Sequence, residues 1–149
     1  MYLLYVSYWQ LYYHIIWATH ERLRLIDADV ERVIAGTLHA KAKDLNCYIH
    51  ALGMVEDHLH LAATIPPSIA ITGVVGAMKG SSSHAANHLA RQADRHFQWQ
   101  DGYGVVSFGE RSLPTVTAYV RNQKEHHAHG ATNALLERID AARGRRSPR

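Results

Sequence analysis

Two short apolar segments joined by a tight turn constrain the fold of this chain most. The first, CYIHALGMVE, covers residues 47–56, and the second, HLHLAATI, covers residues 58–65. Glu56 and Asp57 form the turn, and the prolines at 66 and 67 end the second segment, because proline cannot donate a hydrogen bond to a sheet. The pattern predicts an antiparallel hairpin.

One strand and one helix are expected before the hairpin. Residues 11–18 are rich in tyrosine, tryptophan and isoleucine, which favour strands. Asp27 is a candidate N-cap for a helix that ends near Asn46. Apolar residues recur through this helix at the spacing that lines one helical face.

Two helices are expected after the hairpin, over residues 69–93 and 115–130. A strand over residues 105–108 lies between them, and a short final helix covers residues 132–142. Ser68 is a candidate cap of the first of these helices. Ser112 is expected to cap the second, with Pro114 in its first turn and Gly130 at its end.

The predicted order is β-α-β-β-α-β followed by a C-terminal helix. This order is typical of an α+β, ferredoxin-like (RRM-like) fold, in which an antiparallel sheet has helices packed on one face. Residues 1–142 are expected to form a single domain, and residues 143–149 a basic tail.

Charge and composition permit several partners. The formal net charge is +3 and the pI is about 9.1, which allows a nucleic-acid partner without requiring one. The single cysteine, Cys47, excludes a disulfide within the chain and fits a reducing cytoplasm. The apolar N-terminal segment contains Gln10 and His14 and is too interrupted for a membrane span, so no membrane is expected as a partner.

The second strand of the hairpin carries a pair of histidines. Side chains at i and i+2 of a strand share a face, so His58 and His60 project together while Leu59 and Leu61 face the other way. Two neutral imidazoles on one face can clamp a metal ion. Hydrogen-bonded or surface histidines remain the alternative.

The helix over residues 115–130 carries a second pair, Tyr119 and Gln123, one turn apart. A phenol is a possible nucleophile, and an amide oxygen is a hard metal ligand. With the two imidazoles, they would suit Mg²⁺ or Mn²⁺ and a phosphoryl-transfer reaction on DNA through a phosphotyrosine. Core packing of Tyr119 is the alternative. Histidines 126, 127 and 129 could also bind a metal, but they are expected at the exposed helix end.

Several segments together resemble one family. EDHLHLAATIPP resembles the His-hydrophobic-His (HUH) segment of the single-strand DNA transposases encoded by small insertion sequences, the IS200-like tyrosine transposases. LYYHIIWATHERLRLI, MKGSSSH, WQDGYGVVSF and AYVRNQKEHH resemble further segments of that family in the same order. The resemblance covers nearly the whole chain.

The resemblance implies roles for particular residues. It implies that residues 1–142 are one catalytic domain, that His58, His60 and Gln123 bind a divalent metal, and that Tyr119 forms a 5′-phosphotyrosine bond. It also implies a homodimer with composite sites, in which the His pair of one subunit works with the tyrosine helix of the other. In a related branch of the family, the repeat-associated tyrosine transposases, the resemblance implies instead a monomer whose whole site lies in one chain.

The expected partner is single-stranded DNA that carries a hairpin. Four side chains are candidates for phosphate contacts, because lysine and arginine neutralise phosphates and serine can donate to them. They are Lys79, Ser81, Ser82 and Arg121. Ordinary solvated surface is the alternative for each of them.

Two other functions remain open at this point. The chain could be a metal-dependent hydrolase in which the metal activates water and Tyr119 is structural. It could also be a non-catalytic nucleic-acid-binding module on a ferredoxin-like sheet.

Overall fold

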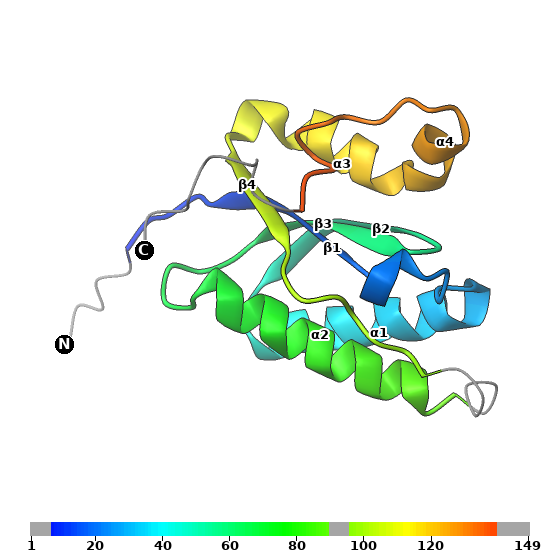
Figure 1. The fold of residues 1–149 in the computed structure, drawn as a ribbon. Coiled ribbons are helices and arrows are strands. Elements are labelled where there is room, and N and C mark those ends of the chain that lie inside the picture. Colours follow the sequence, from blue (N-terminus) through cyan, green and yellow to red (C-terminus); the bar gives the residue numbers. More distant parts are fainter. Residues whose placement is uncertain (1–6, 90–95, 140–149) are drawn as a thin grey trace, which may run out of the picture.

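The computed structural model describes residues 7–89 and 96–139 and shows the predicted fold (Figure 1). Its four-stranded antiparallel sheet has the order β2-β3-β1-β4, which is the ferredoxin-like order. The strands are β1 (Tyr12–Ala18), β2 (Tyr48–Val55), β3 (His58–Thr64) and β4 (Gly104–Phe108). All four strands were predicted, and the tail at 143–149 lies outside the described residues.

The helices lie in two layers, one on each face of the sheet (Figure 1). Helices α1 (Ala28–Asp44) and α2 (Ile71–Asn87) pack together on one face, as expected. Helices α3 (Leu113–Arg121) and α4 (Gln123–Ala128) lie on the other face and contact β2. Two short 3₁₀ turns, His20–Arg22 and Glu110–Ser112, connect the elements.

The main core lies between the sheet and the layer of α1 and α2. A carboxylate oxygen of Asp27 accepts a hydrogen bond from the Val30 amide at 2.9 Å, which confirms the predicted N-cap. Leu59 and Leu61 are fully buried in this core, while Ala62 belongs to a smaller cluster under α3. The alternation of β3 therefore turns its two histidines away from the main core, toward α3 and α4.

Two of the predicted helix starts need correction. Helix α2 begins after Ala70, not at Ser68, because residues 66–69 form a tight turn in which the Ile69 amide bonds to the Pro66 carbonyl. Ser112 precedes α3 but makes no side-chain capping bond. The predicted end of α2, at residue 93, lies outside the described residues.

The C-terminal helices also differ from the prediction. The expected helix over 115–130 is broken at Asn122 into α3 and α4, and both halves stay against β2. No helix forms over residues 132–139. Asn133 accepts a hydrogen bond from the Leu135 amide at 3.0 Å, a local bond that favours a turn over a helix.

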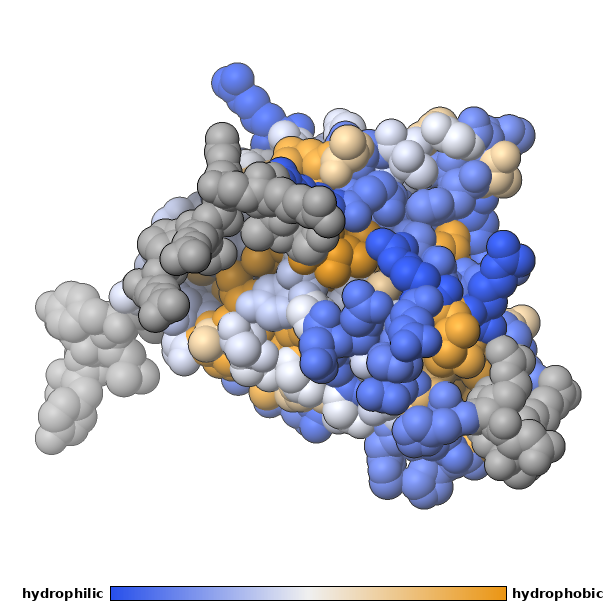
Figure 2. All heavy atoms as spheres, in the orientation of Figure 1, coloured by the Kyte–Doolittle hydropathy of each residue, from blue (hydrophilic) through white to orange (hydrophobic). Residues whose placement is uncertain are grey.

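The surface seen in Figure 2 is a mosaic of hydrophilic and apolar side chains. Within the described residues, no helix is both long and apolar enough to cross a membrane.

Gly53 gives a test of the packing between β2 and α3. A Cβ atom at this position would overlap the carbonyl oxygen of Val120, whereas a Cβ at Gly36 in α1 meets no atom within 4 Å. We expect Gly53→Ala to lower the free energy of unfolding by about 1–3 kcal/mol. Gly36→Ala should raise it by about 0.5–1 kcal/mol. Urea denaturation measures both, and equal effects would contradict this packing.

His14 gives a test of the buried polar pair between β1 and β3. It is 1% exposed, and its Nε2 lies 2.8 Å from Nδ1 of His60. Burial, and secondarily the neighbouring His60, lowers the pKa of His14 to about 3. The unfolded chain, with an ordinary histidine pKa of about 6.5, binds the extra proton between these values.

Stability should therefore be complete above about pH 6.5 and fall as the pH drops toward 3. The slope from this one group is at most about 1.4 kcal/mol per pH unit. His14→Gln keeps a hydrogen-bonding side chain but cannot titrate, so its unfolding free energy should fall less between pH 7 and pH 5. Denaturation at several pH values measures this, and parallel profiles for the two proteins would refute it.

Candidate active site and metal centre

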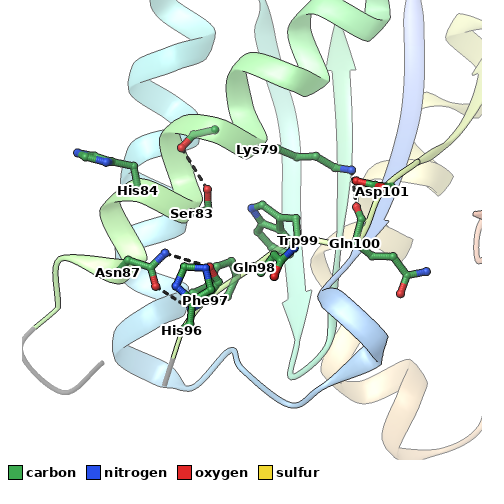
Figure 3. A pocket seen from close by; sticks show the side chains of 11 residues that line it. Lys79, Ser83, His84, Asn87, His96, Phe97, Gln98, Trp99, Gln100 and Asp101 are labelled. Carbon is green, nitrogen blue, oxygen red and sulfur yellow. Dashed lines mark hydrogen bonds between the residues drawn. The ribbon is translucent and has the colours of Figure 1, made fainter. Parts of the chain in front are cut away.

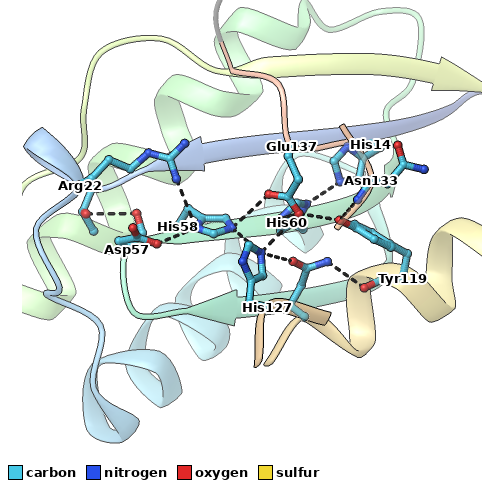
Figure 4. A network of polar contacts seen from close by, with 11 residues as sticks. His14, Arg22, Asp57, His58, His60, Tyr119, His127, Asn133 and Glu137 are labelled. Carbon is cyan, nitrogen blue, oxygen red and sulfur yellow. Dashed lines mark hydrogen bonds and ion pairs between the residues drawn. The ribbon is translucent and has the colours of Figure 1, made fainter. Parts of the chain in front are cut away.

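Strand β3 presents His58 and His60 to a polar cluster under α4 (Figure 4). Both histidines are buried, at 2% and 0% exposure. His127 of α4 and Glu137 of the following segment complete the cluster. One donor atom from each of the four residues lies within 4.8 Å of all the others.

The donor atoms of the cluster lie close together. Nε2 of His58 lies 3.1 Å from Nε2 of His127 and 3.4 Å from Oε2 of Glu137. Oε1 of Glu137 lies 3.2 Å from Nε2 of His60 and 3.3 Å from Nε2 of His127. Three imidazole nitrogens thus surround one carboxylate.

The outer nitrogens of the β3 histidines have their own partners. Nδ1 of His58 lies 2.6 Å from the Asp57 carboxylate, so it carries a proton and donates it. Nδ1 of His60 faces His14. Such partners fix a ring so that its Nε2 lone pair is turned to a ligand site. Burial lowers the pKa of His60, which keeps its imidazole neutral, although Glu137 opposes this.

The carboxylate of Glu137 is held ionised. Burial alone would raise its pKa, but the adjacent His58 and His60 rings and the hydrogen bond from Tyr119 hold the pKa well below the usual range for a carboxyl group. A carboxylate with such a pKa is a poor proton acceptor, so Glu137 is better suited to bind cations than to act as a general base.

Tyr119 lies at the same cluster. Its hydroxyl donates to Oε1 of Glu137 at 2.6 Å and accepts a hydrogen bond from the Asn133 amide at 2.8 Å. Burial is the main reason why the pKa of Tyr119 rises to about 12, and the Glu137 carboxylate adds to the shift. The phenol is therefore protonated at neutral pH in this conformation.

Gln123 lies at the edge of the cluster. It is 1% exposed, and its Oε1 lies 3.1 Å from Nε2 of His127. Its amide nitrogen donates to the carbonyl oxygen of Tyr119 at 2.8 Å. The structure thus brings together all four residues singled out in the sequence, with the amide oxygen of Gln123 turned toward the cluster.

Two members of the cluster, His127 and Glu137, and the neighbouring His14 were not among the expected ligands. His127 was predicted at an exposed helix end, but its ring lies against His58, with centroids 4.7 Å apart. Its position four residues after Gln123 was a usable signal, since this spacing shares a helical face. His14 and Glu137 had no such signal, because each reaches the cluster through contacts distant in sequence.

The candidate phosphate contacts of α2 are already engaged within the chain. The Lys79 ammonium donates to the carbonyl oxygens of Gln100 and Gly102 at 2.8 and 2.6 Å. Ser82 is fully buried, donates to the Met78 carbonyl and accepts a bond from the Trp99 indole. The prediction of a surface role for Ser82 is therefore corrected: its hydroxyl bonds the loop that carries Trp99 to α2.

The other two candidates are more accessible. Ser81 is partly buried, and Arg121 is exposed with one guanidinium nitrogen 3.4 Å from the carbonyl oxygen of His50.

A groove of about 540 Å³ is lined by α2 and by residues 96–101 (Figure 3). Its walls include Lys79, His84 and Trp99, and it lies apart from the histidine cluster.

The tyrosine and the histidines of one chain meet directly. His60 and Tyr119 have ring centroids 5.9 Å apart. This contact lies within a single chain, so a composite site made by two subunits stays a prediction.

Known proteins share both this sequence pattern and this fold. Residues 7–123 match the family described as "Transposase IS200 like". The transposase for insertion sequence element IS200 of Salmonella typhimurium is 25% identical over 127 residues, which cover 82% of each chain. The ISDra2 transposase TnpA of Deinococcus radiodurans is 24% identical over 121 residues, covering 78% of this chain and 86% of the relative.

Two solved structures share the fold. A Deinococcus radiodurans R1 protein crystallised as a transposase superposes with a TM-score of 0.64 and 24% identity, over 83% of this chain and 98% of its own. A REP-associated tyrosine transposase bound to a REP hairpin superposes with a TM-score of 0.60 and 14% identity, over 86% and 74%. The match over most of its length shows that this chain belongs to the IS200-like transposase family.

Proposed function

We propose that this transposase cleaves and rejoins single-stranded DNA through a 5′-phosphotyrosine intermediate, with Tyr119 as the nucleophile. One observation carries the proposal: a single oxygen of Glu137 lies 2.6 Å from the Tyr119 hydroxyl and 3.2 Å from Nε2 of His60. A nucleophile and a candidate metal ligand thus approach the same point. A metal-dependent hydrolase without a covalent step is the alternative.

The residues fit a divalent cation. Nε2 of His60 is fully buried and, among the described residues, makes no hydrogen bond, although it lies near Glu137. A buried ring nitrogen without a hydrogen-bond partner is costly, and a cation in the space before it would remove that cost. His58 and His60 would hold the ion, with the Gln123 oxygen as a third ligand. When bound, Mg²⁺ or Mn²⁺ would withdraw charge from the scissile phosphate.

The chemical step follows from Tyr119. Its hydroxyl oxygen attacks phosphorus, an O–P bond forms, and the bond from phosphorus to the 3′ oxygen of the preceding nucleotide breaks. The phenol loses its proton and the leaving 3′ oxygen gains one. The released 3′-hydroxyl, or that of another strand, reverses the attack and rejoins DNA without ATP.

The environment of Tyr119 must change for this step. Its pKa of about 12 reflects burial and the adjacent carboxylate. Displacement of Glu137 by a DNA phosphate beside a cation would remove part of that effect. The Asn133 amide, which already donates to the hydroxyl, could stabilise a phenolate.

The substrate is proposed to be single-stranded DNA with a hairpin near the end of the element. The family supports DNA as the partner, and one structural neighbour is bound to a REP hairpin. Arg121 and Ser81 are the accessible candidates for phosphate contacts. Lys79 is a third, because its ammonium group has three N–H donors and two of them bond to carbonyl oxygens within the chain. Action as a homodimer in the cytoplasm completes the proposal.

The direct test is a covalent adduct. Single-stranded oligonucleotides from the flanks of the gene would be incubated with the protein and Mg²⁺ or Mn²⁺, then run on a denaturing gel. We expect a slowly migrating protein–DNA adduct with metal and a loss of at least about 10³-fold in Tyr119→Phe, because no nucleophile remains. Tyr103→Phe, whose hydroxyl bonds to Thr72, is the matched control and should keep the adduct.

Cleavage without an adduct, at equal rates in both variants and the wild type, would favour the hydrolase. DNA binding with no cleavage under any metal would favour a non-catalytic module.

Arg121 gives a second test, of the DNA contact. If it neutralises one phosphate, Arg121→Ala should weaken binding of a hairpin oligonucleotide and reduce the slope of log K against log salt by about 1. Arg32→Ala, which removes an exposed arginine of α1 paired with Asp29, is the control and should leave the slope unchanged. Fluorescence anisotropy at several salt concentrations measures the slopes, and identical slopes for all three proteins would remove Arg121 from the interface.

A further inference from the structure

We propose that the same site has a second, closed state, in which His58, His60, His127 and Glu137 together bind a Zn²⁺-type ion and shut the DNA site. This inference rests on the proposed function and adds its regulation. It differs from the open site of His58, His60 and Gln123, because His127 and Glu137 replace Gln123 as donors.

The spacing of the donors fits a tetrahedral ion. A zinc site with bonds of about 2.0–2.1 Å has donor atoms about 3.3–3.4 Å apart along each edge of the tetrahedron. With Oε1 of Glu137 as the carboxylate donor, three of the six separations are 3.1, 3.2 and 3.3 Å. The other oxygen, Oε2, lies 3.4 Å from His58. One donor atom of each residue lies within 4.8 Å of the other three. Small adjustments of the side chains would therefore enclose an ion.

The donor types also favour zinc over magnesium. Three imidazole nitrogens and one carboxylate oxygen are the ligands that Zn²⁺ takes in proteins, whereas Mg²⁺ prefers oxygen ligands and retains several waters. Asp57 and His14 orient the rings of His58 and His60 from outside, as second partners do in zinc sites.

The segment that supplies Glu137 is built into the fold. The side chain of Leu136 is buried at 8% exposure. The carbonyl oxygen of Arg138 approaches Gly104 of β4 so closely that a Cβ atom there would overlap it. Asn133 is bonded to the Tyr119 hydroxyl. These contacts hold Glu137 over the histidines from both sides along the chain.

Closure has a direct consequence for catalysis. Four protein ligands fill a tetrahedral ion and leave no position for a phosphate oxygen. The Glu137 carboxylate also accepts the hydrogen bond of the Tyr119 hydroxyl. DNA can enter only when residues 133–137 move away, so an ion that binds the closed set more tightly shifts the population toward the inactive state.

The test is metal binding by the full-length protein, followed in two ways. Isothermal titration calorimetry gives the Zn²⁺ affinity, and Co²⁺ substitution reports geometry, since tetrahedral Co²⁺ absorbs visible light far more strongly than octahedral Co²⁺. We expect one Zn²⁺ per chain and a tetrahedral Co²⁺ spectrum. Glu137→Gln and His127→Asn should each weaken Zn²⁺ binding by at least about tenfold and reduce the absorption.

Glu125→Gln, which removes an exposed carboxylate of α4 outside the cluster, is the matched control and should bind as the wild type does. Thermal unfolding of each variant checks that it folds. Unchanged Zn²⁺ affinity in both folded cluster variants, or an octahedral Co²⁺ spectrum, would overturn the closed site.

A functional arm separates this inference from the proposed function. Micromolar Zn²⁺ should suppress the Mg²⁺-dependent adduct of the wild type, and Glu137→Gln should resist suppression. Equal suppression of both proteins would refute the regulatory role. If no adduct forms with Mg²⁺ in any protein, the proposed function fails, while the binding data still decide whether the closed site exists.

Discussion

The site depends on the alternation of side chains along β3. One face of this strand carries Leu59 and Leu61 into the main core, and the other carries His58 and His60 under α4. The burial that stabilises the leucines therefore fixes the direction of the imidazoles. A shift of register by one residue would exchange the two sets, so folding of the core and formation of the site are the same event.

The second constraint is the approach of helices α3 and α4 to the sheet. Gly53 allows the backbone of α3 to lie against β2, and Ala51, Ala62, Val116 and Val120 form the small core beneath it. This packing brings Tyr119 and Gln123 over the histidines. The break at Asn122 keeps α4 in contact with β2 and places His127 in the cluster.

The sequence predicted the parts of the molecule that follow local rules. The hairpin, the Asp27 cap and the shared face of His58 and His60 depend on periodicity and turn chemistry within a few residues. The position of Glu137 could not be predicted, because it depends on the turn at Asn133 and on the contact between residue 138 and Gly104. The burial of Ser82 could not be predicted either, since it follows from the loop that carries Trp99.

The central claim is that His58 and His60 hold a cation within reach of the Tyr119 oxygen. Anomalous diffraction from Mn²⁺-soaked crystals of the protein with a single-stranded hairpin oligonucleotide tests it most directly. The claim predicts one strong anomalous peak bonded to Nε2 of both histidines, with the scissile phosphate between that peak and Tyr119. A bound oligonucleotide with Mn²⁺ elsewhere, or with no phosphate near Tyr119, would contradict it.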